Sequence, residues 1–183
     1  MNRLEGKVAI LTGGAGGLGK AAAKLFANEG AKVLLSDLSE DACKEAVAEI
    51  GSENVSYFAG NVTSVEDNVA MAQAAVERYG GIDILFANAG VEGSPDDILK
   101  VSEGDFDFAH AINVKGPFHG IRAVAESMKS RGGGSVVITS SIAATRGGMV
   151  SYVTSKHATT GLMRSAAKFL APLNIRVNTV NPG

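Results

Sequence analysis

The sequence predicts an α/β fold: a doubly wound parallel sheet of six strands with helices on both faces. Short apolar runs alternate with helix-patterned segments along the whole chain. Parallel neighbours require such helical crossovers, which are nearly always right-handed. The chain has 183 residues and no Pro- or Ser-rich linker, so we expect a single domain over residues 1–183.

The first apolar run, residues 7–12, is followed by a glycine-rich turn and a helix pattern over 18–29 that ends at Gly30. Ser39 and Ser64 stand where the next two helices begin. The other expected strands cover 32–36, 54–58, 82–86, 135–139 and 175–180, and the other helices 39–50, 64–79, 104–129 and 151–170. Ligands bind such sheets outside the carboxyl ends of the strands, so we expect the functional residues there.

Composition and charge exclude several classes of protein. Apolar residues make up 45% and charged residues 20%, which is a globular composition. The net charge of −2 offers no basic surface for a nucleic-acid partner. No apolar run is long enough for a bilayer, and the start lacks a signal-peptide stretch, so we expect a cytoplasmic protein without a membrane partner. A single cysteine, Cys43, and three dispersed histidines predict neither a disulfide nor a metal site.

The turn between the first strand and helix, residues 12–19, reads TGGAGGLG. A dinucleotide pyrophosphate would meet backbone N–H groups and the positive helix end here. Glycine is needed because a Cβ would hold the phosphates away. The glycines fit two spacings, GxGxxG at Gly14, Gly16 and Gly19, and TGxxxGxG at Gly13, Gly17 and Gly19. A flexible loop is the alternative, which the flanking strand and helix disfavour.

Asp37 follows the second strand, where an acidic side chain accepts hydrogen bonds from the adenosine ribose hydroxyls. A carboxylate would repel a ribose phosphate, and the glycine turn contains no Arg or Lys to neutralise one. We therefore expect NAD rather than NADP as the cofactor. As an alternative, Asp37 caps the next helix, a role that Ser39 fills equally well.

Two further strand ends fall along the same edge of the sheet. Asn61 and Val62 end the third strand and Asn88, Ala89 and Gly90 the fourth. These residues are expected to meet the adenine edge and the ribose, although generic turn chemistry explains them nearly as well.

Tyr152 and Lys156 are four residues apart on an expected helix, so their side chains share one face. A nearby ammonium stabilises phenolate, which would let Tyr152 exchange a proton with an alcohol or ketone. Ser140 or Ser141, at the end of the fifth strand, can supply a hydroxyl donor to the carbonyl oxygen. A chance pair on an exposed helix is the alternative.

Together these motifs resemble the short-chain dehydrogenase/reductase family, in its compact single-domain branch. The matches span nearly the whole chain in family order: residues 12–19 as TGxxxGxG, 87–90 (ANAG) as a variant of NNAG, Asn113, the pair Ser140 and Ser141, 152–156 as YxxxK, and 181–183 (NPG) as the family's Pro-Gly.

The resemblance implies a Rossmann-like fold and NAD(P)-dependent hydride transfer between a small secondary alcohol and a ketone. Tyr152 is then the acid/base, Lys156 the cation that supports it and holds the nicotinamide ribose, a serine the group that orients the substrate, and Asn113 the holder of a proton-relay water. The cofactor site would comprise Gly13, Gly16, Gly17, Leu18, Gly19, Asp37, Leu38, Asn61, Val62, Asn88, Ala89, Gly90, Tyr152, Lys156, Pro182 and Gly183. A homodimer or homotetramer through the two long helices is also implied. The alternatives are a 3-oxoacyl thioester reductase, disfavoured by Asp37, and a catalytically silent scaffold.

Three departures from the family pattern affect these expectations. The serine position thirteen residues before the tyrosine holds Thr139, so we prefer Ser141, with a loop two residues shorter, and place Ser140 second. Asn61 replaces the usual Asp but keeps an acceptor oxygen. The chain stops at Gly183, where family members continue, so we expect a substrate-covering segment and a C-terminal strand to be missing.

Pro117 gives independent support for Asn113. Proline has no N–H to bond the carbonyl of residue i−4, so the carbonyl of Asn113 is left free. A kink that binds a water needs such a carbonyl; a packing kink whose carbonyl is satisfied by solvent is the alternative.

Overall fold

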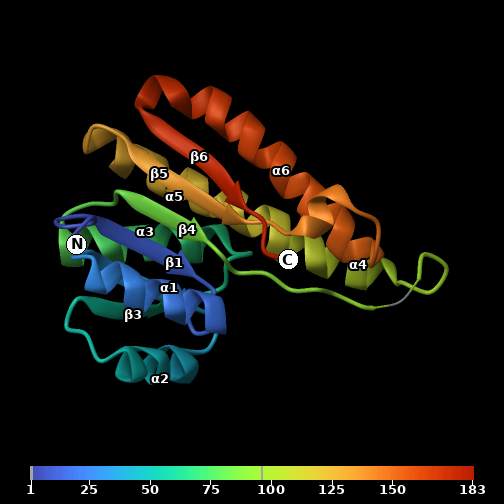
Figure 1. Cartoon of the computed structure of the whole chain (residues 1–183), viewed down its shortest axis with the longest axis horizontal. Helices are drawn as coiled ribbons and strands as arrows, with labels where there is room; N and C mark the ends of the chain where they lie inside the picture. The colour runs from blue at the N-terminus through green and yellow to red at the C-terminus, as the bar shows by residue number, and fades with distance from the viewer. Residues whose placement is uncertain (1, 96) are drawn as a thin grey trace.

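The computed structural model describes residues 2–95 and 97–183, which form a parallel sheet in the order β3-β2-β1-β4-β5-β6 (Figure 1). The strands are β1 Val8–Thr12, β2 Lys32–Asp37, β3 Val55–Ala59, β4 Ile84–Ala87, β5 Gly134–Thr139 and β6 Ile175–Val180. All neighbouring strands are parallel. The predicted fold class is therefore confirmed, and the predicted strand ends differ from the observed ones by at most two residues.

Helices cover both faces of the sheet. They are α1 Gly17–Asn28, α2 Glu40–Ile50, α3 Val65–Tyr79, α4 Glu103–His110, α5 Gly116–Ser130 and α6 Val150–Leu170. Successive side chains of a strand point to opposite faces. In β1, Ala9 and Leu11 pack with α1 and α2, whereas Ile10 packs with α3 and α5 and with partly buried residues of α6. Both faces are thus buried, as a parallel sheet requires.

The strand order reverses direction at β1. The chain proceeds from β1 through α1 to β2 on one side, and α3 then carries it back to β4 on the other side of β1. A crevice opens at the carboxyl ends of the strands where such a reversal occurs. The glycine turn after β1, Asp37 at the end of β2 and the residues after β4 meet at this crevice.

The expectation of one helix over residues 104–129 is wrong. The segment forms α4, then a π-helical turn over Ala111–Lys115, then α5. In the π turn the N–H of Gly116 bonds to the carbonyl of Ala111, five residues earlier. Pro117 lies in the first turn of α5, where its missing N–H removes one α-helical bond. The α-helical hydrogen bonding is thus interrupted just before Pro117, by a wide turn that contains Asn113.

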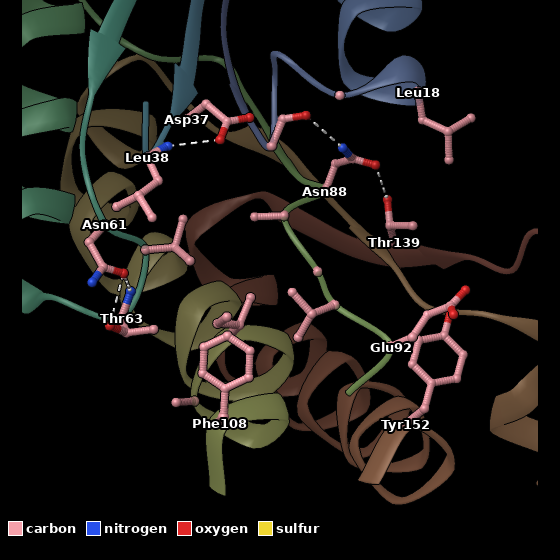
Figure 2. Close-up of a pocket in the computed structure, with 18 of the residues that line it drawn as sticks. Leu18, Asp37, Leu38, Asn61, Thr63, Asn88, Glu92, Phe108, Thr139 and Tyr152 are labelled. Carbon is pink, nitrogen blue, oxygen red and sulfur yellow. Dashed lines mark hydrogen bonds between the residues drawn. The ribbon is translucent and has the colours of Figure 1, made fainter. Parts of the chain in front are cut away.

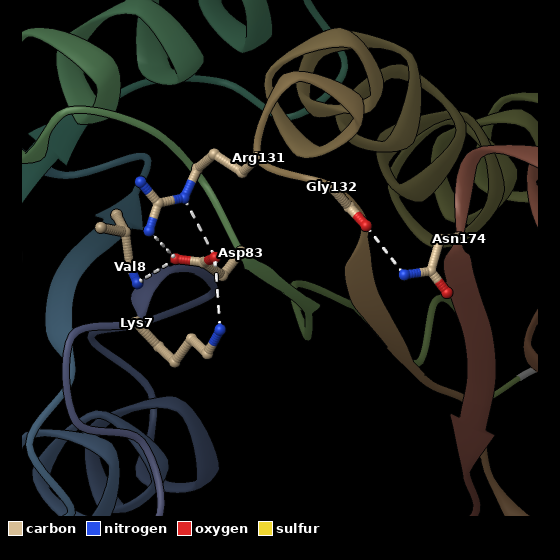
Figure 3. Close-up of polar contacts among 6 residues, drawn as sticks. All are labelled: Lys7, Val8, Asp83, Arg131, Gly132 and Asn174. Atoms are coloured by element: carbon tan, nitrogen blue, oxygen red, sulfur yellow. Dashed lines mark hydrogen bonds and ion pairs between the residues drawn. The ribbon is translucent and has the colours of Figure 1, made fainter.

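At the amino ends of the strands, opposite the groove end, the Asp83 carboxylate joins three segments of the chain (Figure 3). Asp83 accepts a hydrogen bond from the backbone N–H of Val8 at 2.8 Å and two from the Arg131 guanidinium, at 3.0 Å and 2.9 Å. Lys7 adds a longer ion pair at 3.8 Å. The pKa of Arg131 is raised, chiefly by its hydrogen bond to Asp83. Nearby, Asn174 donates to the carbonyl of Gly132 at 2.8 Å and so ties β6 to the end of α5.

Candidate active site

A groove of about 870 Å³ crosses the carboxyl ends of the strands (Figure 2), a volume in the range of small-molecule sites. Most of the predicted site residues line it: Gly13, Gly16, Gly17, Leu18, Asp37, Leu38, Asn61, Val62, Asn88, Ala89, Gly90, Tyr152 and Lys156. Those that do not are Gly19, Asn113, Ser141, Pro182 and Gly183.

The glycine turn is shaped by close backbone approaches. Gly13 has a φ of +63°, and a Cβ on it would lie 2.8 Å from the Cα of Ala89. A Cβ on Gly19 would overlap the carbonyl oxygen of Gly13, so glycine at this position lets the turn pack closely against the start of α1. Gly19 itself does not line the groove. The N-cap residue Gly16 has no side-chain cap, which leaves the first-turn N–H groups of α1 available to an anion.

Asp37 braces the glycine turn and does not cap a helix. One carboxylate oxygen accepts from the N–H of Ala15 at 3.1 Å and the other from the N–H of Leu38 at 2.8 Å (Figure 2). The cap of α2 is Ser39, whose hydroxyl accepts from the N–H of Ala42. Because an ionised carboxylate offers about four acceptor positions, Asp37 keeps acceptors for a ligand in the groove.

The side chain of Asn61 differs from the expectation of a free acceptor. Its Oδ1 accepts from both the N–H and the hydroxyl of Thr63, each at 2.9 Å (Figure 2). A carbonyl oxygen has two lone pairs, so this local turn uses both. What Asn61 retains for a ligand is its amide N–H, which is a donor.

Asn88 connects three strand ends. Its Nδ2 donates to the carbonyl of Gly13 at 3.3 Å, and its Oδ1 accepts from the hydroxyl of Thr139 at 3.0 Å (Figure 2). The hydroxyl of Thr12 accepts from the N–H groups of Asn88 and Ala89, at 3.1 Å and 3.2 Å. The ends of β1, β4 and β5 are thereby fixed along the floor of the groove.

Tyr152 and Lys156 lie one helical turn apart on α6, and Figure 2 shows Tyr152 at the end of the groove away from Asp37. The Lys156 Nζ is 5.4 Å from the centroid of the Tyr152 ring and donates to the carbonyl of Thr139 at 2.9 Å. Lys156 is only 3% exposed, and burial lowers its pKa from 10.5 to about 8. A Cβ on Gly90 would lie 3.4 Å from this Nζ. A single ammonium group therefore faces both the phenol ring and the backbone after β4.

Asn113 is 1% exposed and does not line the groove, but it bonds to Val91, which does. Its Oδ1 accepts from the N–H of Val91 at 2.8 Å, and its Nδ2 donates to the carbonyl of Val91 at 2.8 Å and to the hydroxyl of Ser155 at 2.9 Å. Both amide hydrogens are committed, so the side chain joins the segment after β4 to α6.

The two serines after β5 have different hydrogen-bond partners. The Ser140 hydroxyl donates to the carbonyl of Lys156 at 3.2 Å and accepts from Thr159 at 3.1 Å, and the residue is 2% exposed. The Ser141 hydroxyl accepts from the N–H of Ala143 at 3.1 Å. Among the described residues, it donates to none. Ser141 therefore retains a donor, whereas the hydrogen-bonding capacity of Ser140 serves the packing of α6 on β5.

The C-terminal residues lie beside this serine turn and not in the groove. The carbonyl of Pro182 accepts from the N–H of Ile142 at 3.0 Å, and the side chain of Ile142 is the group that a Cβ on Gly183 would approach, at 3.7 Å. The structure therefore does not bring Pro182 or Gly183 into the predicted cofactor site.

The sequence did not predict several residues that line the groove: Thr139, Val91, Glu92, Phe108 and Ile112. Thr139 was identifiable as the last residue of a strand. Phe108 and Ile112 lie on α4 and the π turn, whose path the single-helix expectation did not give.

Within residues 2–95 and 97–183, no three His, Cys, Asp or Glu side chains are placed to hold a metal ion. No helix in the same ranges is long and apolar enough to cross a membrane.

The model of the short chain dehydrogenase family matches residues 7–183. Short-chain dehydrogenase reductase 3a of Arabidopsis thaliana is 39% identical over 183 residues, which cover 98% of this chain and 71% of that protein. Short-chain dehydrogenase reductase 4 of the same plant is 42% identical over 182 residues, which cover 98% of this chain and 61% of that protein. The chain thus spans about two thirds of the length of these relatives.

Among solved structures, NAD+-bound xylitol dehydrogenase superposes with a TM-score of 0.94 at 38% identity. The match covers 99% of this chain and 71% of that one.

Proposed function

Because the chain belongs to the short-chain dehydrogenase/reductase family, we propose that it transfers a hydride between a small secondary alcohol and NAD. The observation that carries the proposal is that Tyr152 and Lys156 line the same groove as the glycine turn and Asp37. The NAD+-bound state of the xylitol dehydrogenase structure is consistent with it.

The residues of the groove fit a dinucleotide. The first turn of α1 would bind the pyrophosphate, since its N–H groups carry no side-chain cap and the glycines admit a close approach. Asp37 would accept from the adenosine ribose hydroxyls, and Lys156, which lines the groove beside Tyr152, would hold the nicotinamide ribose. When bound, NAD supplies the hydride acceptor.

Side chains of this chain would carry out the proton transfer. In the oxidising direction, the Tyr152 Oη accepts the proton of the substrate hydroxyl, and the Lys156 ammonium stabilises the phenolate that precedes this step. Ser141 does not line the groove, but its uncommitted hydroxyl hydrogen makes it, rather than Ser140, the serine that would donate to the substrate oxygen and orient it. Asn113 fixes the wide helical turn that would hold a relay water and, through Val91, the backbone beside the substrate.

The proposal favours NAD over NADP on electrostatic grounds. A ribose phosphate would bring about two negative charges next to the Asp37 carboxylate, and since two unit charges in close contact repel each other by about 1 kcal/mol even in water, the cost is about 2 kcal/mol, or roughly 30-fold. Lys20, in α1, is paired with Glu49 and does not line the groove.

The test is the oxidation of a panel of secondary alcohols with each cofactor. We expect turnover with NAD, with a kcat/KM roughly 30-fold above that with NADP, and a smaller ratio for Asp37→Ala. A 3-oxoacyl thioester reductase would instead show its best rates with NADPH and a thioester. A silent scaffold would bind NADH and turn over none of the alcohols, and either result would refute the proposal.

Cytoplasmic location, and self-association through the helices expected over 104–129 and 151–170, stay predictions from the sequence. Cell fractionation and sedimentation measurements test them.

A further inference from the structure

The Glu92 carboxylate lies at the Tyr152 end of the groove, and Figure 2 shows both residues there, away from Asp37. The Glu92 side chain is exposed. Within the part of the chain that the structure describes, it has no hydrogen bond or ion pair. The mechanism above does not use this acceptor group.

The backbone next to Glu92 is held in place. The N–H and the carbonyl of Val91, the preceding residue, both bond to the Asn113 side chain at 2.8 Å. Gly93, the following residue, has a φ of +76°, in the left-handed region that favours glycine. The Glu92 carboxylate therefore projects from a segment that Asn113 holds, which helps a site to bind selectively.

Charge decides which substrate group Glu92 suits. The charged side chains that line the groove are Asp37, Glu92 and Lys156, and Asp37 lies at the far end. An ionised carboxylate only accepts hydrogen bonds, so Glu92 favours a donor and repels an anion. The buried Lys156 ammonium disfavours a cationic substrate at the same end. A neutral hydroxyl satisfies both constraints.

We propose that Glu92 is a specificity-determining residue that accepts a hydrogen bond from a second hydroxyl of the substrate, which makes diols the preferred substrate class. The apolar residues Val91, Phe108 and Ile112 line the same groove and suit the carbon skeleton of such a substrate. The inference rests on the proposed function, because it takes Tyr152 to act on the first hydroxyl.

The test compares kcat/KM with NAD for butan-2-ol, butane-2,3-diol, pentane-2,4-diol and 1-aminopropan-2-ol. The proteins are the wild type, Glu92→Ala, Glu92→Gln and the control Glu77→Ala, an exposed acid on α3 outside the groove. We expect the wild type to prefer one of the diols over butan-2-ol by about tenfold, in line with one hydrogen bond to a charged group.

Glu92→Ala is expected to lower this diol preference by about three- to tenfold, because the second hydroxyl loses its charged acceptor. Glu92→Gln keeps a neutral acceptor oxygen and is expected to fall between Glu92→Ala and the wild type. Glu77→Ala is expected to retain the wild-type preference. An unchanged preference in Glu92→Ala would overturn the inference, and so would a wild-type preference for the amino alcohol that Glu92→Ala abolishes.

A binding measurement separates this inference from the proposed function. The dissociation constants of butane-2,3-diol and butan-2-ol for the NADH complex are measured by NMR titration. If the wild type oxidises no alcohol but Glu92→Ala still weakens diol binding selectively, the proposed function fails and the Glu92 site stands. Equal diol binding by the wild type and Glu92→Ala overturns the site whether or not turnover is seen.

Discussion

Replacing Lys156 with methionine should stabilise the protein near neutral pH while it removes a group that the proposed chemistry needs. The side chain is 3% exposed, and burial lowers its pKa from 10.5 to about 8. The folded state therefore binds the proton more weakly than the unfolded state, so the ammonium destabilises the fold below pH 8. As the pH rises from about 8 to 10.5, the folded state has released this proton while the unfolded state still binds it, so stability rises over this range.

The size of the effect follows from the same shift. A change from 10.5 to about 8 costs about 3 kcal/mol at pH 7, because one pKa unit is worth about 1.4 kcal/mol. Methionine removes this cost but also the hydrogen bond from Nζ to the Thr139 carbonyl, worth about 1 kcal/mol. The expected net gain in free energy of unfolding is about 2 kcal/mol at pH 7 and close to zero at pH 9.5.

Urea denaturation of the wild type and Lys156→Met, followed by circular dichroism at pH 7 and pH 9.5, measures this difference. The comparison of two proteins at each pH cancels the titration of all other groups that the substitution leaves alone. A variant less stable than the wild type at pH 7, or a difference that is the same at both pH values, would refute the reasoning.

Three further substitutions test the architecture. Gly19→Ala, whose Cβ meets backbone, should weaken NADH binding at least tenfold in a fluorescence titration, whereas the control Gly161→Ala, on α6 outside the groove and with open space for a Cβ, should leave it unchanged. Asp83→Asn leaves the Arg131 guanidinium without its carboxylate partner and should lower the free energy of unfolding, measured by urea denaturation, by about 3 kcal/mol. A loss under 1 kcal/mol would contradict the proposal that Asp83 holds Val8 and Arg131 together. Asn113→Ala should lower kcat at least tenfold with a smaller change in NADH affinity, and equal losses in both would argue against a positioning role.

Much of the fold was predictable because each element carries a local signal. Both faces of the sheet are buried, so the strands appear as short apolar runs, and Ser39 and Ser64 cap α2 and α3 as expected. The residues at the strand ends were also predictable, because parallel topology brings all carboxyl ends to one edge. Alternation of strands and helices was enough to place Asp37 and Tyr152 along the same groove.

What escaped prediction depends on contacts between distant segments. The choice between Ser140 and Ser141 depends on which hydroxyl Thr159 and Lys156 occupy, and only packing of α6 on β5 determines that. The anchoring of Val91 by Asn113 requires the π turn, whose hydrogen-bond register has no periodic signal in the sequence. The committed oxygen of Asn61 likewise depends on a local turn with Thr63.

The most direct test of the central claim is the Tyr152→Phe variant, measured for both turnover and NADH affinity. If the phenol is the proton acceptor at the end of an otherwise intact cofactor groove, kcat for the best secondary alcohol should fall by about a thousandfold, while the NADH dissociation constant changes less than about threefold. A variant that keeps more than a tenth of the wild-type kcat would contradict the account, and so would one that loses NADH binding together with turnover.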